Sequence, residues 1–158
     1  MTRGLPLLLL AALSHPALAG PILRNGGFDK ELTPWTCEEG KIVPDPDKKE
    51  NSLLEITLDG GIFGLGQKIK WPANKKELTL SFRVKASVAT EQSPVQWRLR
   101  ISDKEENSAL VAGATIKKSG EWLIVTQVIK RPESEPASMM LESNRGEGIL
   151  WIDDVELK

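Results

Sequence analysis

Leu78-Thr79-Leu80-Ser81-Phe82-Arg83-Val84-Lys85 is the stretch that decides the fold of this chain. Apolar and polar residues alternate along it with a period of two, which is the pattern of a β-strand with one face buried and the other in water. Residues 95–101, Val-Gln-Trp-Arg-Leu-Arg-Ile, repeat the pattern. The two stretches therefore predict strands of a half-buried sheet.

The rest of the chain favours the same kind of structure. Stretches rich in Val, Ile, Thr and Trp predict further strands at 53–58, 62–69, 109–116, 121–130, 138–143 and 149–157. Turn sequences such as Gly60-Gly61 and Pro44-Asp45-Pro46-Asp47 separate them. We find no convincing amphipathic helix. Many short strands with frequent turns are typical of an all-β sandwich or barrel rather than of a parallel sheet.

Two motifs, one at residues 25–35 and one at residues 149–157, narrow the fold further. The first is Asn25-Gly26-Gly27-Phe28-Asp29, followed by Leu32 and Trp35, and the second is the stretch 149–157 with Asp153-Asp154 at its centre. Together they resemble the opening N-x-G-F-E…L…W and the closing x-x-D-D-V-x-L of secreted carbohydrate-binding modules of families 4, 9, 16 and 22. The resemblance implies a galactose-binding-domain-like jelly roll, a β-sandwich of two antiparallel sheets with eight to ten strands. It also implies that the first and last strands lie side by side.

Residues 1–19 are predicted to be a secretory signal peptide. Arg3 supplies a positive start, residues 5–13 are almost continuously apolar, and Ala17-Leu18-Ala19 forms a small-x-small cleavage site before Gly20. The apolar run is shorter than the about 20 residues that a membrane-spanning helix needs. We therefore expect a secreted or periplasmic protein without a membrane anchor, whose residues 20–158 form one domain by length.

The charge of the chain argues against nucleic acid as a partner. Without Arg3, 20 basic side chains face 22 acidic ones, which gives residues 20–158 a net charge of −2. Proteins that bind nucleic acid through electrostatics carry a basic surface instead. The single cysteine, Cys37, cannot form an internal disulfide.

The residue types also argue against catalysis. The one histidine, His15, lies in the predicted signal peptide, so residues 20–158 hold no imidazole for general base chemistry. Asp153 and Asp154 are neighbours on a predicted strand and should point to opposite faces, so they cannot act together on one substrate. We predict that the protein is not an enzyme.

Calcium is a better use for these acidic side chains, because Ca²⁺ binds six to eight oxygen atoms from carboxylates and backbone carbonyls. The resemblance implies a structural calcium ion held by the Gly27 carbonyl and by the carboxylates of Asp29 and Asp153. Asp153 has the parity of Trp151, Val155 and Leu157 in the sequence, which predicts a carboxylate that points inward. An unpaired buried carboxylate is costly, and a metal would relieve that cost. The alternative is that both aspartates accept hydrogen bonds from the backbone or from Arg24.

The aromatic residues bear on sugar binding, because an aromatic ring can stack on the apolar C–H face of a pyranose. The resemblance implies that four aromatic residues of its motifs lie in the core: Phe28, Trp35, Trp122 and Trp151. Alternation predicts the same for Phe82 and Trp97. Trp71 lies in a turn before Pro72 and is predicted to be exposed. Phe63 is a weaker candidate for exposure.

The polar faces of the alternating strands offer a second way to bind sugar. Their outward residues are predicted to be Arg83, Lys85, Gln96, Arg98 and Arg100, with Gln127 beside them. Arg and Gln side chains each make two directed hydrogen bonds, which suits vicinal hydroxyls or a uronic carboxylate. The resemblance implies an extracellular or cell-wall polysaccharide lying along a groove on the concave sheet, and a basic groove would favour an acidic polysaccharide. The alternative is a solvated face with cross-strand ion pairs.

A second function remains open at this point. Carbohydrate-binding modules usually accompany an enzyme, and nothing in residues 20–158 supplies one. A secreted protein-recognition or adhesion domain of the same fold is therefore the alternative to polysaccharide binding.

Overall fold

The computed structural model describes residues 21–158 except residues 30 and 146, so the predicted signal peptide lies outside the described residues. These described residues form nine strands: β1 (Gly40–Pro44), β2 (Ser52–Asp59), β3 (Phe63–Lys68), β4 (Glu77–Ala86), β5 (Val95–Ser102), β6 (Ser108–Ile116), β7 (Leu123–Lys130), β8 (Ser138–Arg145) and β9 (Glu147–Leu157). Within the same residues, we find no helix with the length and apolar character needed to cross a membrane.

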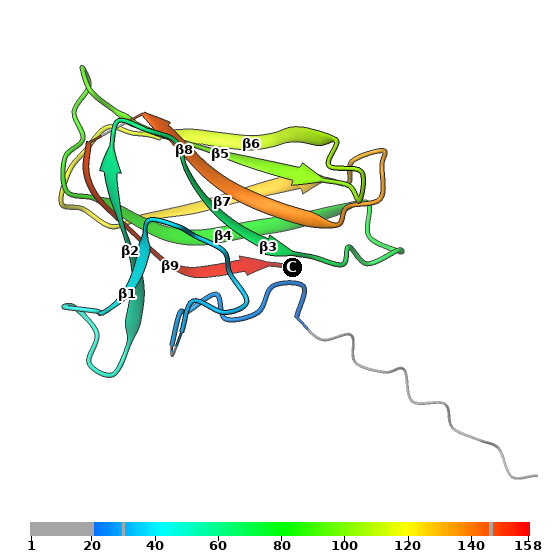
Figure 1. The fold of residues 1–158 in the computed structure, drawn as a ribbon, viewed down its shortest axis with the longest axis horizontal. Coiled ribbons are helices and arrows are strands. Elements are labelled where there is room, and N and C mark those ends of the chain that lie inside the picture. The colour runs from blue at the N-terminus through cyan, green and yellow to red at the C-terminus, as the bar shows by residue number, and fades with distance from the viewer. Residues whose placement is uncertain (1–20, 30, 146) are drawn as a thin grey trace, which may run out of the picture.

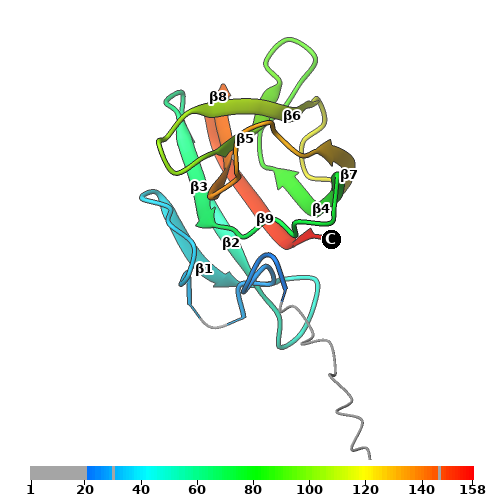
Figure 2. The ribbon, with the colours of Figure 1, turned by 90° about the vertical axis from the view of Figure 1, so that its right-hand side faces the viewer.

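The strands form two antiparallel sheets packed face to face (Figures 1 and 2). The five-stranded sheet has the order β1-β2-β9-β4-β7, and the four-stranded sheet has the order β3-β8-β5-β6. This is the predicted all-β jelly-roll sandwich. The strands expected from alternation and composition are all present, whereas β1 was not expected, because Gly-Lys-Ile-Val-Pro is short and ends in proline.

The core lies between the two sheets and is built from the apolar half of each alternating strand. Phe82 from β4 and Trp97 from β5 meet edge to face across the core, with ring centroids 4.9 Å apart. Phe28 and Trp35 form a second aromatic pair, with centroids 5.8 Å apart. All four side chains are buried, as predicted.

The two end motifs meet, but not as a pair of strands. β1, the first strand, pairs with β2, while the irregular segment at residues 21–28 lies beside the end of β9 (Figure 1). The Val155 N–H donates to the Gly26 carbonyl oxygen at 2.9 Å. A Cβ atom on Gly26 would lie 1.9 Å from the Val155 carbonyl oxygen, so this close approach requires glycine.

A bulge in β9 changes which side chains face the core. Asp154 has a φ of 53°, and the pairing of β9 with β4 shifts register between Ser81 and Arg83. The core-facing residues are Leu150 and Ile152 before the bulge and Val155 and Leu157 after it. Asp153 therefore points away from the inter-sheet core, and its predicted inward orientation is wrong. The side chain is nevertheless buried, because the segment between β1 and β2 covers it.

Candidate functional site

Three of the predicted sugar-binding residues lie together on one surface. Gln96, Arg98 and Arg100 point outward from β5, while the residues between them are buried in the core. We call the outer surface of the four-stranded sheet around these residues the β5 face. The alternation seen in the sequence is the cause, because successive side chains of a strand point to opposite faces.

The strand register places small residues at both margins of the β5 face. Arg98 lies opposite Gly113 of β6 and Glu142 of β8, and Glu142 lies opposite Gly64 of β3. Glycine leaves the backbone open at these margins. A shallow depression of about 510 Å³ runs along Arg98 and Gly113. A second depression, of about 330 Å³, lies beside Gly64.

The charged side chains of the β5 face differ in how they are paired. The Arg100 Nε donates to Glu142 Oε2 at 2.8 Å. This is the kind of cross-strand ion pair expected if the face is only solvated and binds no sugar. Arg98 makes no ion pair with any residue that the structure describes, so its guanidinium is available to a ligand. The described outward residues of these strands include no aromatic side chain. Recognition on this face would therefore depend on hydrogen bonds rather than on stacking.

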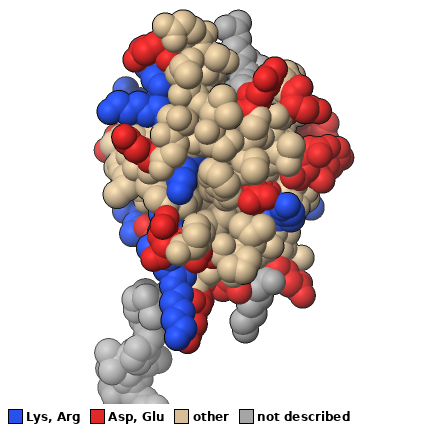
Figure 3. Space-filling model, turned by 90° about the vertical axis from the view of Figure 1, so that its left-hand side faces the viewer, with Lys and Arg blue, Asp and Glu red and all other residues tan. Residues whose placement is uncertain are grey.

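The end of the sandwich at which β8 leads into β9 carries both signs of charge (Figure 3). Uncharged residues cover most of the middle of this view, and acidic and basic side chains lie around it.

Trp71 and Phe63, the aromatic residues predicted to be exposed, are both buried, so these predictions are wrong. Trp71 is only 2% exposed, and its Nε1–H donates to the Lys75 carbonyl oxygen at 2.9 Å. Phe63 is 5% exposed. A turn sequence predicts where the backbone changes direction, but the indole of Trp71 returns to the core and satisfies its donor within the same turn.

The remaining polar candidates lie elsewhere and do not share one surface with Gln96, Arg98 and Arg100. Arg83 and Lys85 are on β4, in the opposite sheet from Gln96, Arg98 and Arg100. Gln127 is on β7 and donates through Nε2 to the Gly113 carbonyl oxygen at 3.2 Å, which links the edges of the two sheets. Alternation identifies outward residues, but it does not identify the sheet to which a strand belongs.

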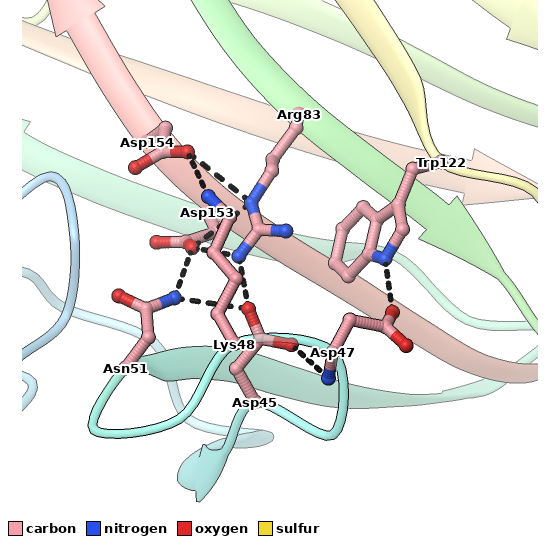
Figure 4. Close-up of polar contacts among 8 residues, drawn as sticks. All are labelled: Asp45, Asp47, Lys48, Asn51, Arg83, Trp122, Asp153 and Asp154. Carbon is pink, nitrogen blue, oxygen red and sulfur yellow. Dashed lines mark hydrogen bonds and ion pairs between the residues drawn. The ribbon is translucent and has the colours of Figure 1, made fainter.

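Arg83 is the centre of a buried polar network (Figure 4). Its guanidinium donates to the carboxylates of Asp45 and Asp153. Asn51 Nδ2 also donates to Oδ2 of both aspartates, at 3.0 Å each. Asp154 Oδ2 lies 3.2 Å from Arg83 Nε and 3.3 Å from Lys48 Nζ. Burial raises the pKa of Asp45, but the hydrogen bonds, first of all the one from Arg83, outweigh it and lower the pKa to about 2.

The network bears on the predicted calcium site. Asp153 Oδ2 already holds Arg83 and Asn51, so the guanidinium compensates the charge that suggested a metal. Asp153 Oδ1 is buried and has no hydrogen-bond partner among the described residues. Asp29 is exposed, and a Cβ atom on Gly27 would lie 3.5 Å from its Oδ1. No group of three or more His, Cys, Asp or Glu side chains in the described part of the chain could hold a metal ion. These carboxylates fit a guanidinium-centred network better than a cation at Asp153, and the calcium site stays a prediction.

Trp122 and Trp151 are partly exposed on the outer surface of the five-stranded sheet, so their predicted place in the core is wrong. The Trp151 Nε1–H donates to Glu55 Oε2, and the Trp122 Nε1–H donates to Asp47 Oδ2, both at 2.9 Å. The alternation of Leu150 and Ile152 around Trp151 was a signal that could have placed this indole outward.

Comparison with known proteins supports the fold. No protein-family model matches the chain, and no curated protein matches it. Among solved structures, "Family 16 Carbohydrate Binding Module-2" matches with a TM-score of 0.66 at 17% identity, over 87% of this chain and 99% of that one. TmCBM61 in complex with β-1,4-galactotriose matches with a TM-score of 0.63 at 20% identity, over 89% of this chain and 99% of that one. The CBM22-1 xylan-binding domain of Xyn10C from Paenibacillus barcinonensis matches with a TM-score of 0.60 at 14% identity, over 84% of this chain and 90% of that one. The chain therefore has the jelly-roll fold of carbohydrate-binding modules.

Proposed function

We propose that the protein binds an extracellular or cell-wall polysaccharide on the β5 face, without catalysing a reaction. The observation that carries this proposal is the outward row of Gln96, Arg98 and Arg100 across a sheet whose margins are glycines. Such a surface offers directed donors to a chain of sugars and leaves room for the chain to lie across the strands. The carbohydrate-binding modules that share the fold support the same function.

Arg98 is the central residue of the proposed site. Its guanidinium has no ionic partner among the described residues, so binding a sugar hydroxyl or carboxylate would break no existing ion pair. Arg100 is held by Glu142 and would act through its remaining N–H groups. Because no indole stacks on the ligand, we expect affinity to be modest and to depend on these hydrogen bonds.

Binding is tested with the purified protein on a panel of neutral and acidic polysaccharides, by affinity electrophoresis. We expect retardation by one class of polysaccharide. Arg98→Ala should weaken that binding by about tenfold or more, since a hydrogen bond to a charged group contributes about 1.5–3 kcal/mol. Lys130→Ala is the matched control, because Lys130 is an exposed cation on β7 in the other sheet.

Two results would contradict the proposal. One is the absence of retardation by every polysaccharide in a protein shown by circular dichroism to be folded. The other is retardation that Arg98→Ala and Gln96→Ala both leave unchanged. The second result would place sugar binding on another surface.

A further inference from the structure

The opposite side of the sandwich has a pocket that the proposed polysaccharide site does not use. It lies on the outer surface of the five-stranded sheet and has a volume of about 250 Å³. We call it the indole pocket, after Trp122 and Trp151, which line it. Its other lining residues include Pro44, Pro46, Glu55 and Lys85. Glu55, Trp151 and Lys85 are neighbours across β2, β9 and β4, so the sheet itself forms the floor.

Both indoles are fixed through their polar edges, so each ring is held in one orientation. The Trp151 ring is anchored to Glu55, and the Trp122 ring to Asp47, each through its Nε1–H at 2.9 Å. The Arg83 guanidinium also stacks on Trp122, 4.4 Å from the ring centroid. An aromatic ring held in one orientation beside a pocket is suited to stack on a flat apolar ligand surface at little entropic cost.

Lys85 is the unpaired charge of this pocket. Its Nζ lies 5.5 Å from the Trp151 centroid and 5.6 Å from the Trp122 centroid, and it makes no ion pair with any described residue. The neighbouring charges are already satisfied. Glu55 is paired with Lys41 at 2.9 Å, and the hydrogen bond from Lys41 lowers the pKa of Glu55, so this carboxylate is ionised and occupied. Arg83 is taken up by Asp45 and Asp153. A half-buried ammonium without a counter-ion favours an anionic ligand.

The geometry points to a binding site for a single pyranose ring that carries a carboxylate or a sulfate. Trp151 and the face of Trp122 that Arg83 leaves open would cover the apolar face of the ring, and Lys85 would pair with its acidic group. The volume is below the roughly 300–1,000 Å³ of pockets for larger ligands, which suits one sugar unit rather than a chain. The residues of the indole pocket are separate from those of the β5 face, so either site can fail without the other.

The test is a titration of the ¹⁵N-labelled protein followed by NMR of the indole Nε1–H signals. The probes are glucuronic acid, galactose 6-sulfate and glucose. We expect the two acidic sugars to shift the signals of Trp122 and Trp151, and glucose to bind at least about tenfold more weakly, because it cannot pair with Lys85. The buried Trp35, Trp71 and Trp97 are internal controls whose signals should not move. Comparing glucuronic acid with galactose 6-sulfate shows whether the pocket prefers a carboxylate or a sulfate.

Variants separate this site from a structural effect and from the β5 face. Lys85→Met should reduce the affinity for the acidic sugars to that for glucose. Lys130→Met removes the same charge from the same sheet at the far end of β7 and should bind as the wild type. Arg98→Ala should leave the indole shifts unchanged, whatever it does to polysaccharide binding. The proposal is overturned if no probe shifts the two indole signals, if glucose binds as tightly as the acidic sugars, or if Lys85→Met binds as the wild type.

Discussion

Arg83 shows how strongly one residue can depend on its surroundings. In the sequence it is one of several outward cations on alternating strands, and nothing near it indicates a partner. In the structure, residues from two other parts of the chain close over it: Asp45 and Asn51 from the segment between β1 and β2, and Asp153 from β9. The guanidinium is therefore a buried structural group rather than a contact for ligands.

Arg83→Met is expected to destabilise the protein by about 3–5 kcal/mol at neutral pH, because it leaves two buried carboxylates without their cation. The loss should shrink in acid. Asp45 has a folded-state pKa of about 2, below its ordinary value of 3.8, so its contribution is complete above about pH 4 and is lost as the pH falls through 2. Urea unfolding of both proteins between pH 7 and pH 2 measures this.

Arg98→Met is the control for that experiment, since it removes the same group from a partly exposed position without an ion pair among the described residues. It should change stability by no more than about 0.5 kcal/mol. Equal stability of the Arg83→Met variant and the wild type at pH 7 would mean that the network contributes nothing.

At the scale of the element, the bulge in β9 decides what the strand presents to each side. Side chains alternate between the two faces of β9, but the left-handed conformation of Asp154 interrupts this alternation. Trp151 and Asp153 therefore point outward before the bulge, whereas Val155 and Leu157 point into the core after it. The same bulge brings Asp153 under the segment between β1 and β2. Without the bulge, strict alternation would place either Asp153 on the core side of the sheet or Val155 and Leu157 on its outer side.

The bulge predicts a difference between two substitutions of Asp154. Both Asp154→Val and Asp154→Gly remove the exposed contacts to Lys48 and Arg83, but only valine is strained at a φ of 53°. We expect the valine variant to be less stable than the glycine variant by about 1–2 kcal/mol, measured by urea unfolding. Equal stabilities would show that the backbone at residue 154 relaxes without cost.

At the scale of the whole molecule, the sandwich has two outer surfaces with different chemistry. The β5 face carries arginine and glutamine over a glycine-edged sheet, and the opposite surface carries the indole pocket and the Arg83 network. The segment before β1 joins this framework where Gly26 meets Val155. Because Gly27 and Asp29 directly follow this contact, the predicted calcium ion would act on how the segment is held against β9.

If the predicted calcium ion binds, it should raise the melting temperature of the protein relative to EDTA-treated protein, in proportion to the logarithm of its concentration above Kd. Asp29→Asn should abolish this increase without lowering the melting temperature in EDTA, since Asp29 is exposed. Magnesium is the control, because its smaller shell needs stricter octahedral geometry. A wild-type melting temperature that calcium leaves unchanged would remove the calcium site from the description of this protein.

The sequence by itself determined the strands other than β1, the polar side of most of them and the class of fold. Residues 78–85 and 95–101 do so because the direction of a side chain along a strand is a local property with a period of two. Only the tertiary structure decided that Arg83 and Arg98 lie on different sheets, that Trp71 is buried, and that Trp122 and Trp151 line a pocket. These facts depend on the pairing of strands far apart in the chain and on the bulge at Asp154, and the same alternating pattern is compatible with either sheet.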